Sequence, residues 1–191
     1  MKRIYLYGQS GHGKVVADIA RACGYDEIVF LDDAGKLKFS PDLPKADILI
    51  SIGDCATREK IQKRVEACGF ALATLVHPSA VVSPSASVGA GSVVMPRAVI
   101  NADAKIGRGV IVNTGAIVEH DCTVGDFAHI CPASAIAGGT VMGERVWFGI
   151  GSCAIQGVSV ADDVFIGAGS TVVSDIPKCR LAYGTPCKVI E

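Results

Sequence analysis

The chain has 191 residues, of which half are hydrophobic, 22 are glycine and only 6% are aromatic, a length that supports one large domain or two small ones. The 18 lysines and arginines nearly balance the 19 aspartates and glutamates, and no long run of like charge occurs, so we expect no nucleic-acid partner. The start lacks the apolar core of a signal peptide, no apolar run is long enough to span a membrane, and the eight cysteines form no CxxC pair, which together predict a soluble, cytoplasmic protein with reduced thiols and no membrane insertion.

The first part of the chain alternates between strand-like and helix-like segments. Four short apolar runs are predicted strands: 3–8, 27–33, 46–54 and 71–77. Two segments are predicted helices: 12–24, with Val15, Val16, Ile19 and Ala20 on its buried face, and 56–69, with Ile61 and Val65 on its buried face. Strands that alternate with helices form parallel sheets. We therefore expect residues 1–75 to form a small, Rossmann-like α/β domain.

From residue 76 onward an apolar residue recurs at every sixth position without an insertion. These positions are Val76, Val82, Val88, Val94, Ile100, Ile106, Val112, Val118, Val124, Ile130, Ile136, Met142, Phe148, Ala154, Val160, Ile166 and Val172. Four positions after each of them the residue is mostly small, as at Ala98, Ala104 and Ser152. Neither an α-helix nor a simple hairpin sheet has a period of six, whereas a coil with three flat sides of six residues does. The repeat predicts a parallel β-helix over residues 76–173, within a second domain of residues 76–191.

A glycine-rich segment, GQSGHGK, follows the first predicted strand. Its glycines Gly8, Gly11 and Gly13 give the order GxxGxG, which is not the GxGxxG order of dinucleotide-binding proteins and argues against an NAD-dependent enzyme. A tight turn into a helix still exposes backbone N–H groups that suit a phosphate, and Asp32 and Asp33 end the second strand, where a ribose hydroxyl is often held. The alternative is a closely packed turn beside a solvated acidic pair.

The segment VEHDCTVGDFAHI, residues 118–130, holds two of the four histidines, His120 and His129, next to the carboxylates of Glu119 and Asp121. Neither histidine falls on an inward position of the repeat, so we expect both to face a cleft. The spacing does not provide the three or four ligands of a zinc site. A histidine beside a carboxylate suits a general base for acyl transfer to a nucleophile, and a solvated surface pair is the alternative.

The combination of GQSGHG, FLDD, EHDC and the hexapeptide repeat resembles the PglD/NeuD-type sugar acetyltransferases over essentially the whole chain. This resemblance implies a left-handed β-helix, acetyl-CoA as donor, no metal, and a homotrimer with active sites between subunits. It also implies transfer of acetyl to the 4-amino group of UDP-2-acetamido-4-amino-2,4,6-trideoxy-glucose. Two alternatives stay open: O-acetylation of sialic acid or another sugar, and a non-catalytic β-helix scaffold.

The resemblance also assigns roles to individual residues. The implied catalytic residues are His120 as general base, Asp121 in place of the family's glutamate, Glu119 as an alternative carboxylate, and His129 near the acetyl carbonyl. The implied contacts of the UDP-amino-sugar are Gly8, Ser10, His12, Asp32, Asp33, Gly53 and Asn113. The implied contacts of acetyl-CoA are His129, Gly138, Gly139, Ile150, Ala168 and Lys188.

Two further expectations concern the surface of the β-helix. The residues Ile111, Ile117, Phe127 and Trp147 are expected on exposed faces with few charges, and such a surface favours association into an oligomer. His77, in the segment HPSA at the first turn, is expected to be a structural residue that caps the entry to the β-helix.

Overall fold

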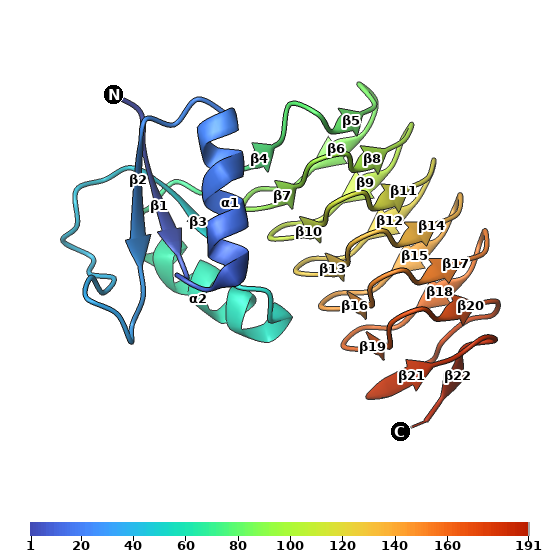
Figure 1. Ribbon diagram of the computed structural model, residues 1–191. Coiled ribbons are helices and arrows are strands. Elements are labelled where there is room, and N and C mark those ends of the chain that lie inside the picture. The colour runs from blue at the N-terminus through green and yellow to red at the C-terminus, as the bar shows by residue number, and fades with distance from the viewer. Residues whose placement is uncertain (191) are drawn as a thin grey trace.

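The computed structural model describes residues 1–190 and contains a small α/β domain beside a long coil of short strands (Figure 1). The α/β domain consists of β1 (Arg3–Tyr7), α1 (Gly11–Ala22), β2 (Glu27–Leu31), β3 (Asp47–Ile50) and α2 (Cys55–Ala67). Its three strands are parallel, in the order β2-β1-β3. The predicted alternation of strands and helices is therefore confirmed.

Helix α1 joins the α/β domain to the coil. Its buried side chains include Val16 and Ile19, which belong to one apolar cluster with Ile4 of β1 and with Val93 and Ile111 of the coil. The two parts of the chain thus share a core, as their close approach in Figure 1 suggests. The predicted buried face of α1 was wrong in one position, because the Val15 side chain is 42% exposed.

Helix α2 is buried along a stripe that mixes apolar and polar residues. Asp54 caps it by accepting a hydrogen bond from the Thr57 N–H at 2.8 Å. Val65 is fully buried as predicted, but Ile61 is only half-buried. The other buried positions of this helix are Cys55, Arg58 and Gln62. The spacing of three, four and three residues keeps these positions on one face of a helix.

The coil is a parallel β-helix with three flat sides. Its two-residue strands are β4 (Leu75–Val76), β5 (Val81–Val82), β6 (Ser87–Val88), β7 (Val93–Val94), β8 (Val99–Ile100), β9 (Lys105–Ile106), β10 (Ile111–Val112), β11 (Ile117–Val118), β12 (Thr123–Val124), β13 (His129–Ile130), β14 (Ala135–Ile136), β15 (Val141–Met142), β16 (Trp147–Phe148), β17 (Cys153–Ala154), β18 (Ser159–Val160), β19 (Phe165–Ile166) and β20 (Thr171–Val172). Strands β21 (Leu181–Tyr183) and β22 (Lys188–Val189) form an antiparallel end. The predicted β-helix over residues 76–173 is confirmed.

The strands stack into three sheets, which we call sheets B, C and D. Sheet B has the order β22-β21-β19-β16-β13-β10-β7-β4, sheet C the order β20-β17-β14-β11-β8-β5, and sheet D the order β18-β15-β12-β9-β6. Each residue lies above the residue 18 positions later, as in the pairing of Ile111 with His129. We call the three edges of the coil corners BC, CD and DB, in the order in which the chain passes them.

The interior of the coil is filled by the repeat. From Val94 to Val172 every sixth-position residue is buried, while Val82 and Val88 are half-buried and Val76 is exposed in the first coil. The smaller residues four positions further are buried beside them, as at Ala98, Ala104 and Ser152. One continuous apolar column therefore supports the length of the coil.

Two expectations about the surface and the domain junction were wrong. Ile111 and Phe127 are buried, with 1% and 4% of their surface exposed, because the α/β domain covers sheet B and corner DB. Residues 71–77 do not form one strand, since Leu72 makes an isolated bridge to Ile48 of the α/β domain whereas β4 pairs with β7 of the coil. The predicted domain boundary between residues 75 and 76 falls within β4.

Candidate active site

A first candidate region lies at the carboxyl ends of β1 and β2, where parallel sheets commonly bind ligands. A cavity of about 130 Å³ is lined there by Tyr7, Gly8, Asp32, Asp33, Ile52 and Ile61. Three of these residues, Gly8, Asp32 and Asp33, are among the predicted nucleotide-sugar contacts. Ser10 and His12 lie at the adjacent start of α1, and Gly53 follows β3.

Two of the three glycines of the GQSGHGK segment, Gly8 and Gly13, are required by close backbone packing. Gly8 has a φ of +123°, and a Cβ there would lie 2.8 Å from the Ile52 side chain. A Cβ on Gly13 would lie 2.1 Å from the Gly8 carbonyl oxygen. The Ser10 side chain makes no capping hydrogen bond at the start of α1. This turn therefore combines tight packing with an open helix N-terminus that suits an anion.

The two aspartates of this region have different surroundings. Asp32 accepts a hydrogen bond from the Ala34 N–H at 2.9 Å and a longer one from Gln9 N–H at 3.4 Å. Asp33 forms an ion pair with Arg64 at 3.2 Å. Burial, together with the hydrogen bond to Asp33, raises the pKa of Tyr7 to about 12. Asp32 thus shapes the loop, whereas Asp33 is held at the rim of the cavity.

A second candidate region lies where sheet B passes under the α/β domain. His129 is 4% exposed, so the expectation that it faces an open cleft is wrong within one chain. Its Nε2 accepts a hydrogen bond from the Asn113 side-chain amide at 2.9 Å, and its ring lies 6.3 Å from that of His12. The ring also lies beside the backbone of Gly53. The structure therefore brings four predicted site residues together.

The two histidines of this region are neutral at physiological pH. Burial and the nearby charge of Arg58 lower the pKa of His129 to about 3 and that of His12 to about 4. Because Nε2 of His129 accepts from Asn113, the proton of the neutral ring lies on Nδ1. Among residues 1–190 neither this Nδ1 nor Nε2 of His12 has a hydrogen-bond partner. His129 therefore keeps a buried N–H donor beside the Gly53 backbone.

A third candidate region lies at corner CD and holds His120. The His120 Nδ1 donates to Asp121 at 2.7 Å, and this hydrogen bond raises the pKa of His120. Glu119 makes no hydrogen bond to the ring among residues 1–190. The His120 ring lies over Gly138, where an added Cβ would come within 2.6 Å of the ring. The carboxylate that orients His120 is therefore Asp121, and glycine beneath it leaves room for the ring.

The predicted cofactor residues fall at two corners of the same chain. Gly138 and Gly139 share corner CD with His120, and the Gly139 N–H donates to the His120 carbonyl at 2.9 Å. Ile150 and Ala168 follow sheet B strands at corner BC, on the side of Asn113 and His129. Lys188 is exposed in β22. Sheet C lies between these two corners of one coil.

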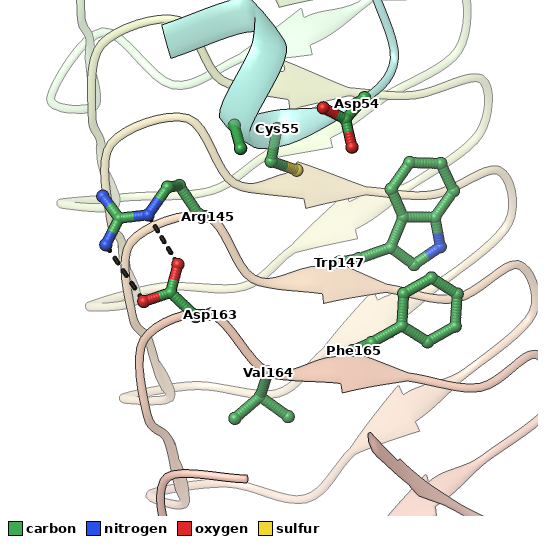
Figure 2. Close-up of a pocket in the computed structure, with 8 residues that line it drawn as sticks. Asp54, Cys55, Arg145, Trp147, Asp163, Val164 and Phe165 are labelled. Atoms are coloured by element: carbon green, nitrogen blue, oxygen red, sulfur yellow. Dashed lines mark hydrogen bonds and ion pairs between the residues drawn. The ribbon is translucent and has the colours of Figure 1, made fainter. Parts of the chain in front are cut away.

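A larger cavity of about 450 Å³ lies on sheet B below α2 (Figure 2). The Trp147 and Phe165 rings stack on its floor, with centroids 5.6 Å apart and an angle of 6° between the planes. Arg145 and Asp163 form an ion pair at its edge, at 2.6 Å. The repeat predicts Trp147 on an exposed face but does not connect it with this cavity. The column of outward residues on sheet B, which runs through His129, Trp147 and Phe165 at intervals of 18, is the signal that identifies it.

Comparisons with known proteins find relatives of this chain that have the same two-part fold. Residues 3–44 match the family model of the PglD N-terminal domain. The chain is 40% identical to the acetyltransferase domain of PglB from Neisseria gonorrhoeae FA1090, with a TM-score of 0.93 and full coverage of both chains. The chain belongs to the PglD/NeuD-type sugar acetyltransferases.

Two further relatives of this family carry informative names. A histidine-to-asparagine mutant of perosamine N-acetyltransferase from Caulobacter crescentus, solved in complex with CoA and GDP-perosamine, is 38% identical with a TM-score of 0.96, covering 100% of this chain and 98% of that one. The curated UDP-N-acetylbacillosamine N-acetyltransferase of Bacillus subtilis (strain 168) is 34% identical over 110 residues, which are 49% of this chain. That match spans only about half of the curated relative, 51% of its length.

Membership in the PglD/NeuD-type family confirms the predicted fold, a Rossmann-like α/β domain followed by a left-handed parallel β-helix. Among residues 1–190 no group of three or more histidine, cysteine, aspartate or glutamate side chains is placed to hold a metal ion. No helix in the described part of the chain has the length and apolarity needed to cross a membrane. The roles of the predicted site residues stay predictions.

Proposed function

We propose that the chain transfers an acetyl group from acetyl-CoA to the amino group of a nucleotide-linked sugar. The observation that carries this proposal is likeness over the whole chain to an N-acetyltransferase whose structure contains CoA and GDP-perosamine. A relative solved with acetyl coenzyme A, at 40% identity, supports the donor. The curated relative acts on a UDP-linked sugar by its name, which favours UDP-2-acetamido-4-amino-2,4,6-trideoxy-glucose as acceptor. A cytoplasmic location stays a prediction.

In the proposed reaction the sugar amine attacks the thioester carbonyl carbon, so that a C–N bond forms and the C–S bond of acetyl-CoA breaks. His120 takes the proton that the amine loses, and the resulting imidazolium returns it to the CoA thiolate. Because Nδ1 of His120 donates to Asp121, Nε2 is the basic nitrogen. Nδ1–H of His129 is a suitable donor to the oxygen that becomes negative in the tetrahedral intermediate.

We propose that each active site combines two subunits. His129, Asn113, Ile150 and Ala168 lie on sheet B and corner BC, whereas His120 lies at corner CD, so contact between corner BC of one chain and corner CD of a neighbour would join the two groups. The outward column of sheet C, which lies between these corners, favours such contact because it is uncharged and mostly apolar: Val81, Val99, Ile117, Ala135, Cys153 and Thr171. A ring of three chains closes with this heterologous interface.

The proposed activity is tested by CoA release from acetyl-CoA with a panel of acceptors. The panel contains UDP-linked and GDP-linked 4-amino sugars, their 4-hydroxy counterparts and free sialic acid. Turnover with an amino sugar and none with its hydroxy counterpart would support N-acetylation. Turnover confined to the hydroxyl acceptors would replace it by O-acetylation, and no CoA release with any acceptor would contradict transferase activity.

Asp121→Asn is expected to move the acidic limb of the pH profile of kcat/KM to lower pH. A general base works in its unprotonated form, so activity rises as the pH passes upward through the pKa of His120. The hydrogen bond to Asp121 raises that pKa, so the loss of this bond lowers the pKa of His120 and weakens the base. The plateau rate should therefore fall at least about tenfold. Glu119→Gln is the matched control, and a larger shift in that variant would assign the orienting role to Glu119.

Ile117→Asp is expected to break the proposed trimer. The Ile117 side chain is 36% exposed at the centre of sheet C, and burying an unpaired carboxylate there would cost more than the interface gains. Light scattering after size exclusion should show a fall in mass of about threefold, to that of one chain. Thr123→Asp, on an exposed strand of sheet D beside Lys105, is the control and should leave the mass unchanged. A wild-type chain that is already monomeric would contradict the proposal.

A further inference from the structure

Arg58 is a buried charge that none of the predicted roles uses. Its side chain is 1% exposed, and among residues 1–190 no carboxylate forms an ion pair with it. Instead, its guanidinium donates to five backbone carbonyls, those of Ile52, Gly53, Gly109, Phe127 and Ala128. A group that costs much to bury is thus satisfied mainly by backbone carbonyls from both domains, with one further hydrogen bond to the Cys55 Sγ at 3.6 Å.

The five carbonyls divide into two sets with different positions. Nη1 donates to Ile52 at 3.0 Å and to Gly53 at 2.7 Å, which form the loop between β3 and α2 beside the first cavity. Nε donates to Gly109 at 2.7 Å, and Nη2 donates to Phe127 and Ala128, the two residues that precede His129. One planar side chain therefore ties the loop to the strand that carries His129.

We propose that Arg58 is a positioning residue that fixes His129 relative to the Ile52–Gly53 loop and thereby aligns the acetyl group with the bound sugar nucleotide. This inference rests on the proposed function for its kinetic consequence. Its structural consequence, the fixed relation between Gly53 and the His129 ring, stands independently. The fork of five N–H donors is needed for this role, since an ammonium group cannot reach both sets of carbonyls at once.

The charge of Arg58 acts on the same site. The titratable groups that surround the His129 ring or Arg58 are His12 from α1, Cys55 and Asp54 from the start of α2, and Cys131 from the coil. Of these only Asp54 is anionic at neutral pH, and its carboxylate is used to cap α2. Burial, together with the positive charge of Arg58, holds the His129 ring neutral and leaves its Nε2 available to Asn113.

The test compares Arg58→Lys and Arg58→Met with Gln62→Met as a matched control. Gln62 lies one turn further along α2, is fully buried, and packs on Gly91 and Gly109 of the same corner, and among residues 1–190 its side chain donates only to the Ala90 carbonyl. All three variants remove contacts between the domains, so all three should lower Tm. Only the Arg58 variants should move the ring ¹⁵N signals of His129 and lose hydrogen-exchange protection along the Ile52–Gly53 loop.

The kinetic measurement separates alignment from stability. With the nucleotide amino sugar as variable substrate, both Arg58 variants should raise KM and lower kcat by about tenfold or more each. Gln62→Met should change each within about twofold. Equal kinetic and ring-signal changes in Gln62→Met and Arg58→Lys would overturn the proposal and leave Arg58 as a general docking residue. If no acceptor is acetylated, the ring signals and exchange rates still decide the role of Arg58, whereas the proposed function fails separately.

Discussion

His120→Ala is expected to lower the rate of acetyl transfer by about 10²–10⁴-fold, which is the usual contribution of a general base. The side chain is exposed, and among residues 1–190 its ring hydrogen-bonds only to Asp121, so its removal takes away no buried hydrogen bond. Fold, oligomeric state and Tm should therefore stay as in the wild type. The measurement is CoA release at saturating acetyl-CoA and acceptor, together with the dissociation constant of the acceptor, which should be almost unchanged.

His77→Ala is the control for this prediction. His77 is another histidine of the coil, but its Nδ1 accepts from the Ser79 N–H at 3.0 Å within the first turn, which agrees with the predicted structural role. Its loss should leave the rate within about twofold and affect only the local turn. If His120→Ala kept the wild-type rate, His120 at corner CD would not be the general base. If both variants lost activity, the cause would be a general effect on the coil.

The sequence predicted the coil well because the repeat and the fold have the same period. Inward positions recur every six residues along the sequence, so Val112, Ile130 and Phe148 could be assigned to the core by counting. The corners follow from the same count, which is why His120 was correctly placed at a position that does not point inward. The spacing of residues in the sequence therefore determines which side chains point into the coil and which lie at its corners.

What covers the outside of the coil does not follow from the repeat. Ile111 and Phe127 occupy outward positions and were expected to be exposed, yet the α/β domain buries both. The repeat has no information about which of three sides another domain occupies. A partial signal was present in α2, where Arg58 and Gln62 lie in phase with Cys55 and Val65. Polar residues on a buried stripe indicate that the stripe meets backbone rather than apolar side chains.

The site residues also divide into contacts that follow from the local sequence and contacts that depend on how the two domains pack. Asp121 beside His120 is a contact between chain neighbours, and the sequence identified the pair although it left Glu119 open. The pairing of His129 with Asn113 joins two neighbouring coils, whereas the approach of His12 depends on the start of α1 lying beside the strand that carries His129. These residues were assigned to a site through the family resemblance, and their spacing in the sequence alone does not predict it. Their burial and lowered pKa values required the packing of the two domains.

Phe148→Ala is expected to reduce the free energy of unfolding by about 3–5 kcal/mol, a large part of the total of a typical domain. Phe148 is fully buried in the apolar column and lies between Ile130 and Ile166 of the adjacent coils. The β-helix backbone is fixed by hydrogen bonds to the coils above and below, so it cannot collapse into the space that the ring leaves. The loss should appear in urea unfolding at one fixed chain concentration, because assembly also contributes to stability.

Phe165→Ala is the matched control, since it removes the same ring from the outward side of the coil. Phe165 is 44% exposed and stacks on Trp147, so its removal should cost only about 0.5–1.5 kcal/mol beyond a small loss of buried area. The difference between the two variants measures the inward column against the outward stack within adjacent coils. Equal losses would mean that the column is not the principal source of stability, and that the cover of sheet B by the α/β domain carries more of the fold than the repeat does.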